Sequence, residues 1–216
     1  MYLPAHFAVT DLDLIHEFVT KVAAADLVTV DETGQPLSTL MPCVWKHDDS
    51  DHGTLLMHMA RANKQWESMV DGSRALAIVH GPQAYISPSN YATKAEHGKV
   101  VPTWNYTAVH LSGTIHVSHD PDYLRDIVRE LTDIHETERK TPWAIDDAPE
   151  TYLSAQLRGI VAITMQVDRV EAKAKLGQNR SQQDQDGVVT DLASSAKPQD
   201  QDIATLMSTE GNNLIR

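Results

Sequence analysis

Residues 103–118 read TWNYTAVHLSGTIHVS, and this stretch carries the strongest fold signal in the chain. β-branched and aromatic residues dominate it, and such residues favour extended strands. Gly113 lies inside the run, where a glycine marks a bend or the close approach of another backbone. We therefore expect one long strand that bends near Gly113.

Apolar and β-branched runs recur on both sides of this stretch. DLVTV at 26–30 and PLSTLMPCVW at 36–45 flank Gly34 and Pro36, which is a hairpin signal. The other predicted strands are TLLMHM at 54–59, RALAIVHG at 74–81, AYIS at 84–87 and IVAITMQVDRVEAKAKL at 160–176. Because the order lacks a regular βαβ rhythm, it predicts a mainly β protein, an antiparallel barrel of about six strands with peripheral helices.

Capping residues place short helices between these strands. Asp120 followed by Pro121 is typical of a helix start, because the first residue caps and the second needs no amide partner. Asn63 is likewise suited to cap a helix. The predicted helices cover about 11–25, 64–70, 121–137 and 149–157.

The charge balance bears on possible partners. The chain has 216 residues, which permits one large domain or one domain with an appendage. Its 18 basic and 30 acidic residues give a net charge of −12, so the average surface repels nucleic-acid phosphates. No helix-turn-helix with a basic recognition helix is visible, and direct DNA binding is therefore doubtful.

Other features of composition predict location and domain layout. The single cysteine, Cys43, excludes an intramolecular disulfide and suits a reducing compartment. No run approaches the roughly 18 apolar residues of a membrane span, and the first residues lack a secretory signal, so we expect a cytoplasmic protein without membrane contact. We expect a domain over 1–190, followed by an acidic polar tail over 191–216 that is mobile or weakly docked.

Two clusters of donors could hold an anion. HMARANKQW at 58–66 places Arg61, Asn63 and Lys64 where a strand meets a helix. KAKLGQNR at 173–180 follows the last strand and supplies Lys173, Lys175, Gln178, Asn179 and Arg180. A guanidinium can donate two parallel hydrogen bonds to phosphate oxygens, and an ammonium beside it adds a compact positive charge. Taken alone, each cluster could equally be a solvated polar loop.

A third cluster is VPTWNY at 101–106, where Trp104 stands between Thr103 and Asn105. A flat aromatic beside directional donors could hold a planar heterocycle. The alternative is a tryptophan packed into one end of the barrel.

The histidines and the cysteine predict neither a metal site nor a nucleophile. His110 and His116 share strand parity, but His119 does not, so the three cannot line one face. Cys43 lies in an apolar run, where a buried thiol is usually inert. We predict no metal site and identify no catalytic residue.

Five ordered motifs resemble the PaiB-like FMN-binding proteins of the flavin split-barrel superfamily. The motifs are MYLPAHF at 1–7, HMARANKQW at 58–66, GPQAYISPSNY at 81–91, VPTWNY at 101–106 and KLGQNRSQQD at 175–184. The resemblance covers residues 1 to about 190. It implies an FMN-binding split barrel, a six-stranded antiparallel barrel that forms a homodimer and holds FMN in clefts at the subunit interface.

The resemblance also implies roles for individual residues. Arg61 and Lys64 would hold the flavin phosphate, with Asn63 at the helix entrance, and Thr39 would lie along the edge of the isoalloxazine ring. The remaining contacts would come from Thr103, Trp104, Asn105, Lys175, Gln178, Asn179 and Arg180. The family's usual KLSQNR reads KLGQNR here, so Gly177 removes a hydroxyl and weakened FMN binding is expected.

By resemblance, the expected function is that of a negative transcriptional regulator acting through flavin binding. The alternative is an FMN-dependent oxidoreductase, either similar to pyridoxamine-phosphate oxidase or a flavin reductase. A haem-degrading protein is a weaker alternative, because the histidines form no discriminating pattern.

Overall fold

The computed structural model describes residues 1–208. Its strands are β1 (Ala8–Val9), β2 (Ala24–Val30), β3 (Pro36–Lys46), β4 (Thr54–Ala60), β5 (Arg74–Ile86), β6 (Thr103–Ser118) and β7 (Ile160–Lys175). Its helices are α1 (Leu12–Val22), α2 (Thr93–His97), α3 (Pro121–Glu136), α4 (Glu150–Leu157), α5 (Gln182–Ala193) and α6 (Pro198–Ser208). Short 3₁₀ turns are η1 (Ala5–Phe7), η2 (Lys64–Ser68), η3 (Pro88–Asn90) and η4 (Ile145–Asp147). Within this range, no helix is both long and apolar enough to cross a membrane.

The strands form a ring of hydrogen-bonded neighbours. The sheet order is β1-β7-β4-β3-β2-β5-β6, and β6 also pairs with β7. Strands β7, β4, β3, β2, β5 and β6 therefore close on themselves, and the pairs β2–β3, β2–β5, β3–β4 and β4–β7 are antiparallel. The predicted antiparallel barrel with peripheral helices is confirmed. β1, which pairs with β7 through Ala8 and Lys173, was not predicted.

The described chain divides into two compact units. Unit 1 contains Met1–Phe18, His80–Val109 and the described residues from Glu171 onward. Unit 2 contains Val19–Val79 and His110–Val170. Strands β5, β6 and β7 each contribute residues to both units.

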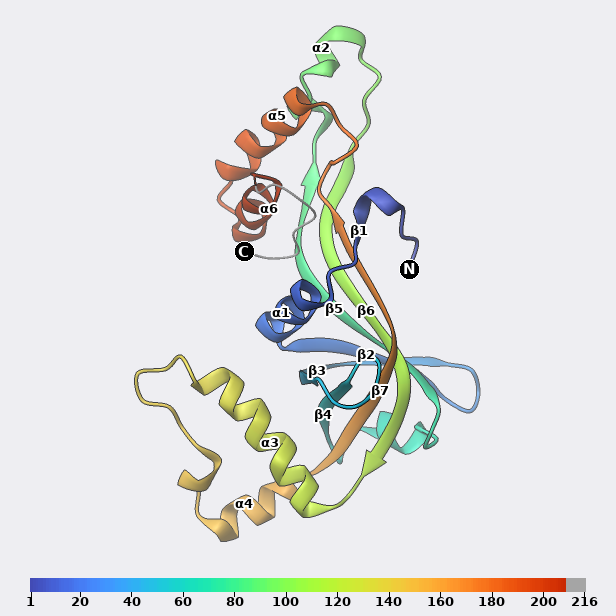
Figure 1. The fold of residues 1–216 in the computed structure, drawn as a ribbon, viewed down its shortest axis with the longest axis vertical. Helices are drawn as coiled ribbons and strands as arrows, with labels where there is room; N and C mark the ends of the chain where they lie inside the picture. The colour runs from blue at the N-terminus through green and yellow to red at the C-terminus, as the bar shows by residue number, and fades with distance from the viewer. Residues whose placement is uncertain (209–216) are drawn as a thin grey trace. The chain divides into compact units, whose positions relative to one another are not determined.

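In unit 2, side chains from both faces of β4 are buried. Leu55 and Met57 on one face lie opposite Met165 and Ile163 of β7 in the register. Leu56 points to the other face, since successive strand residues alternate. There it joins a cluster with α3 and α4, which lie beside each other in Figure 1. The buried members are Leu56, Leu124, Ile127, Leu131, Ile145, Leu153, Leu157 and Ala162.

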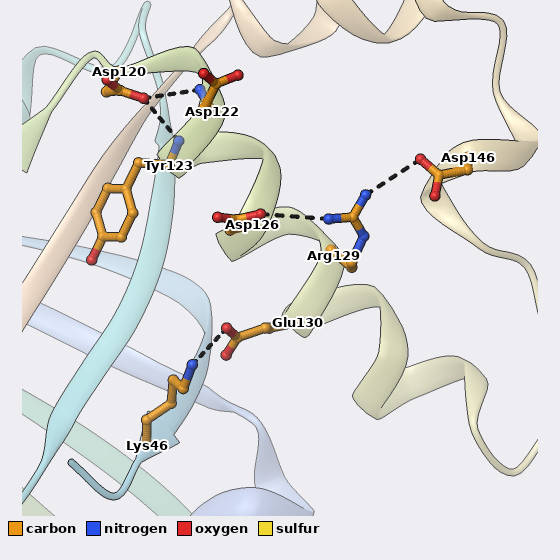
Figure 2. Close-up of polar contacts among 8 residues, drawn as sticks. All are labelled: Lys46, Asp120, Asp122, Tyr123, Asp126, Arg129, Glu130 and Asp146. Carbon is orange, nitrogen blue, oxygen red and sulfur yellow. Dashed lines mark hydrogen bonds and ion pairs between the residues drawn. The ribbon is translucent and has the colours of Figure 1, made fainter.

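The start of α3 matches the prediction, as Figure 2 shows. Asp120 accepts hydrogen bonds from the backbone amides of Asp122 and Tyr123 at 2.9 Å each. Further along the helix, Lys46 of β3 donates to Glu130 at 2.7 Å. The apolar face of α3 is therefore buried. Exposed ion pairs lie along its sides, and such pairs contribute little to the free energy of unfolding.

Two local expectations were wrong. The first helix ends at Val22 rather than near residue 25, because Ala23 adopts φ 50° and the chain then enters β2. Gly81 does not separate two strands, since β5 runs through it. A Cβ at Gly81 would lie 2.0 Å from Thr107 Oγ1, so this glycine allows a close approach and does not form a turn.

Residues 191–208 of the expected tail are largely helical in the structure. This part of unit 1 forms the end of α5 and all of α6, which pack against each other (Figure 1). Leu192, Ile203 and Leu206 are buried. Asp184 near the start of α5 is 3% exposed and accepts from the Thr93 amide at 3.0 Å. Residues 209–216 of the predicted tail lie outside the described residues.

Gly113 is the position at which we expect substitution to damage the barrel most directly. A Cβ there would lie 2.1 Å from the carbonyl oxygen of Gln166 on β7. We predict that Gly113→Ala lowers the free energy of unfolding by about 1–3 kcal/mol, as overpacking does. Urea unfolding would measure this, with Ser112→Ala as the control in the same strand. Unchanged stability would mean that the β6 and β7 backbones lie farther apart than described.

Candidate functional site

The candidate residues in unit 2 surround the turn after β4. Asn63 caps η2 by accepting from the Gln65 amide at 3.0 Å. Its side-chain amide donates to Thr39 Oγ1 at 2.9 Å, and Thr39 Oγ1 donates to Gln65 Oε1 at 2.5 Å. The structure thus brings Thr39 and Asn63 together, and both use their side chains to fix the turn against the β2–β3 hairpin.

Gln65 is a residue that the sequence analysis missed. It is 5% exposed, and its amide nitrogen donates to Leu27 O and Thr29 Oγ1 at 3.0 Å each. Burying an amide is tolerated here because its hydrogen bonds are satisfied. Nothing in the local sequence distinguishes Gln65 from an exposed glutamine, so no signal could have identified it.

The two cations of this turn point to different partners. The Arg61 Nε donates to Arg158 O at 2.9 Å, and its Nη2 donates to Ile160 O at 3.2 Å. Lys64 pairs with Glu67 at 2.8 Å, and its side chain is 77% exposed. Within unit 2, therefore, Arg61 and Lys64 do not share a partner in this structure.

The candidate residues in unit 1 include a cluster of like charges. Lys175 Nζ donates to Thr103 Oγ1 at 2.8 Å and to the carbonyl oxygen of Trp104. Burial lowers the pKa of Lys175, and the nearby charges of Lys173 and Arg180 lower it further. Lys175 is thus a cation with neutral hydrogen-bond partners and cationic neighbours, a setting that favours an anion.

Lys173 is held by aromatic rings. It is 6% exposed, and its Nζ lies 5.6 Å, 5.9 Å and 5.2 Å from the ring centroids of Tyr2, Phe7 and Tyr106. The same nitrogen donates to Tyr2 O at 3.0 Å. Cation–π contacts of this kind stabilise a desolvated ammonium. They also attach the MYLPAHF segment to β7, which gives that motif a structural role.

The loop after β7 is shaped by its own side chains. Gln178 accepts from the Leu176 amide at 2.9 Å and donates to Ala174 O at 2.7 Å. The Arg180 guanidinium lies 4.7 Å from the Tyr91 ring centroid, whereas Asn179 is exposed. Gly177 has φ 81°, a conformation that suits glycine and strains other residues. The glycine that departs from the family motif therefore has a local conformational reason.

Trp104 and its neighbours face different surroundings. Asn105 is 2% exposed and donates to Met207 Sδ at 3.3 Å. Trp104 is 52% exposed, and its ring lies 6.2 Å from that of Tyr85 in an edge-to-face arrangement. Both rings line a groove of about 510 Å³ beside α5 and α6. Thr103 accepts a hydrogen bond from Lys175. Thr103, Trp104 and Asn105 therefore do not form one surface that a single ligand ring could contact.

Cys43, the single cysteine, is a buried free thiol. Burial raises the pKa of Cys43 to about 12, which keeps the thiol protonated at neutral pH. Among residues 1–208, no group of three or more His, Cys, Asp or Glu side chains is arranged to hold a metal ion.

The fold belongs to the class of split barrels, which solved structures share. The FAD and haem binding protein of Mycobacterium smegmatis superimposes with a TM-score of 0.57 at 16% identity, covering 78% of this chain and 73% of that one. A conserved hypothetical protein of Mycobacterium tuberculosis superimposes with a TM-score of 0.56 at 12% identity, covering 84% and 94%. At such identities the likeness establishes the fold alone.

Sequence comparison identifies the family. Residues 1–169 match the family described as "Putative FMN-binding domain". The protease synthase and sporulation protein PAI 2 of Bacillus subtilis (strain 168) is 33% identical over 207 residues, which cover 96% of each chain. The chain belongs to this FMN-binding-domain family, and the predicted membership among PaiB-like proteins is confirmed. A flavin is accordingly the supported ligand.

The lowered pKa of Lys175 predicts how stability depends on pH. Because the folded state disfavours the charged amine, it binds fewer protons than the unfolded chain between the lowered pKa and the ordinary value of 10.5. We expect Lys175→Met to be more stable than the wild type at neutral pH, with the difference shrinking as pH rises through the lowered pKa. Urea unfolding at neutral pH and at about pH 10 would measure it. A difference independent of pH would contradict this account.

Proposed function

We propose that the protein binds FMN and acts as a PaiB-type negative transcriptional regulator through flavin binding rather than through a dedicated DNA-binding motif. The observation that carries the FMN proposal is the cluster of Lys173, Lys175 and Arg180 at the end of β7. A phosphate near Lys175 would offset the repulsion within this cluster. Family membership supports FMN as the flavin.

The cations of this cluster differ in how far they are available to a ligand. Lys173 is enclosed by rings, and Arg180 stacks over Tyr91. Lys175 is half-buried, with a hydroxyl and a carbonyl oxygen as its partners. An ammonium that is partly removed from water and not neutralised is well suited to a phosphate oxygen. We therefore assign the strongest phosphate contact in unit 1 to Lys175.

The remaining contacts are proposed from the family motifs. They would come from Thr39, Arg61, Asn63, Lys64, Thr103, Trp104, Asn105, Gln178, Asn179 and Arg180. When bound, FMN would supply its electron-transfer chemistry, while these residues bind and orient it. Gln178 and Thr39 would act mainly by shaping the backbone, since their side chains already have internal partners.

Charge favours an indirect route for regulation. A net charge of −12 opposes the phosphate contacts that supply most non-specific DNA affinity. The name of the Bacillus subtilis relative refers to protease synthase and sporulation, which suits a regulatory protein. We propose that a flavin-dependent change is passed to a protein partner in the cytoplasm, where the single cysteine would stay reduced.

An FMN-dependent oxidoreductase is the second candidate. The groove beside Trp104 and Tyr85 favours it, because two half-exposed rings could hold an aromatic substrate near Lys175. NAD(P)H oxidation faster than that of free FMN would support the enzyme, and a rate equal to that of free FMN would remove the flavin-reductase version.

The FMN proposal predicts the effect of single substitutions on affinity. We expect Lys175→Ala and Arg61→Ala each to weaken FMN binding roughly ten- to a hundredfold, the range for a lost hydrogen bond to a charged group. Riboflavin, which lacks the phosphate, should bind all variants alike. Fluorescence titration of the purified protein would measure both ligands, with Lys99→Ala removing an exposed charge as the control. FMN affinity unchanged in both variants would remove the phosphate assignment.

We also propose a homodimer, supported by an exposed apolar sheet face in unit 2. Leu40 is 66% exposed and Val30 is 58% exposed, and both point away from the buried face of the β2–β3 hairpin. Leu76 pairs with Val28 on the neighbouring strand and extends this face. Such a surface suits contact with a second copy because apolar residues dominate it, with Asp26, opposite Leu40 in the register, as its charged member.

The dimer proposal predicts that a charge on this face breaks the assembly. We expect Leu40→Asp to be monomeric by light scattering at concentrations where the wild type is dimeric. Val70→Asp is the matched control, because Val70 is 62% exposed but lies outside the sheet. A dimer that persists in Leu40→Asp, or a monomeric wild type, would contradict the proposed interface.

A further inference from the structure

A cavity in unit 2 gathers positively charged side chains, none of which belongs to the Lys175 cluster of unit 1. It has a volume of about 350 Å³, within the range of small-molecule sites. Arg61, Arg125 and Arg158 line it together with His119, and the acidic lining residues are Asp122 and Glu150. Three arginines against two carboxylates leave one positive charge before His119 is counted, in a chain whose net charge is −12.

The Arg61 guanidinium is fixed before any ligand arrives. Its Nε and one Nη2 hydrogen are directed to the carbonyl oxygens of Arg158 and Ile160. A guanidinium carries five N–H donors, so these two bonds leave donors for another acceptor. Because both acceptors are main-chain atoms, the orientation does not depend on the side chain of residue 158.

Trp66 connects Arg61 to a second wall residue. Its indole Nε1 donates to Arg61 O at 2.9 Å. Its ring also meets the His119 ring edge-on, with centroids 5.3 Å apart. One tryptophan therefore holds the main chain of Arg61 and packs against the imidazole of His119, which limits the reorganisation that binding would require.

The carboxylates leave part of the cationic lining unneutralised. Glu150 pairs with Arg125 and also accepts from Ser154 Oγ at 2.9 Å. Arg158 is exposed at the cavity, and Arg61 is bonded to neutral carbonyl oxygens. Lys64, the other cation of the HMARANKQW motif, pairs with Glu67 instead. Arg61 thus lines the same cavity as Arg158 and His119, whereas Lys64 does not line it.

We propose that this cavity binds a phosphate group through Arg61, Arg158 and His119. Forked guanidinium donors match the several acceptor oxygens of a phosphate better than they match a single carbonyl. The phosphate could belong to FMN, in which case the inference rests on the proposed function and adds His119 and Arg158 to the site. It could instead belong to a separate phosphorylated metabolite that binds independently of the flavin, in which case Arg61 serves this cavity and not the FMN phosphate.

Inorganic phosphate is the direct probe of the cavity. Calorimetric titration of the flavin-free protein should detect binding, and Arg158→Ala should weaken it about tenfold or more, as expected for a lost charged hydrogen bond. Arg139→Ala is the matched control, since it removes an exposed arginine that pairs with Glu136 outside the cavity. Phosphate that does not bind the wild type, or that binds Arg158→Ala with wild-type affinity, would overturn the proposal.

FMN and riboflavin distinguish the two sources. If the cavity holds the FMN phosphate, inorganic phosphate competes with FMN, and Arg158→Ala weakens FMN but not riboflavin. If it holds a separate metabolite, phosphate binds the FMN complex as well, and Arg158→Ala leaves FMN affinity unchanged. A wild type that binds phosphate but not FMN would refute the proposed function while supporting the cavity.

Discussion

The close contact between β6 and β7 is the constraint on which the rest of the architecture depends. The sheet closes only because these strands pair, and they approach so tightly at Gly113 that no side chain fits against Gln166 O. Several candidate residues lie at strand ends: Arg61 follows β4, Thr103 begins β6, and Lys175 ends β7. Functional residues at the ends of a rigid scaffold can vary without unfolding it.

The second organising feature is the choice of partners for the positively charged side chains of the candidate sites. In an acidic chain, the lysines and arginines of the candidate sites could have been paired with carboxylates, and Lys64 is. Lys173, Lys175 and Arg61 instead meet rings, a hydroxyl or carbonyl oxygens. Neutral partners hold a cation in place without cancelling its charge, so the cation keeps its attraction for an anion.

The sequence predicts much of the fold because its signals are local. Asp120 and Pro121 mark a helix start, and the hairpin around Gly34 follows from turn chemistry. The errors arise where long-range packing decides. Gly81 resembles a turn residue but serves a close approach to Thr107, and α6 buries Ile203, Ala204 and Leu206 although its sequence is polar overall.

The same limit applies to the candidate site. Motifs identify Thr39, Asn63, Thr103 and Lys175, and the structure brings the first two together in unit 2 and the last two together in unit 1. The sequence does not identify Gln65, and it offers His119 only as a possible metal ligand, because only folding brings these residues beside Thr39 and Trp66. That Arg61, Lys64 and Lys175 hold one flavin phosphate stays a prediction from family resemblance.

Gly177 has a consequence for how long a ligand stays. Its φ of 81° is comfortable for glycine, whereas a serine in the same turn would offer a hydroxyl at the expense of backbone strain. A chain that forgoes this hydroxyl would exchange its flavin with the surrounding pool more readily. Rapid exchange suits a protein whose occupancy follows the cellular supply of the nucleotide, and it would be a disadvantage for one that must keep a permanent prosthetic group.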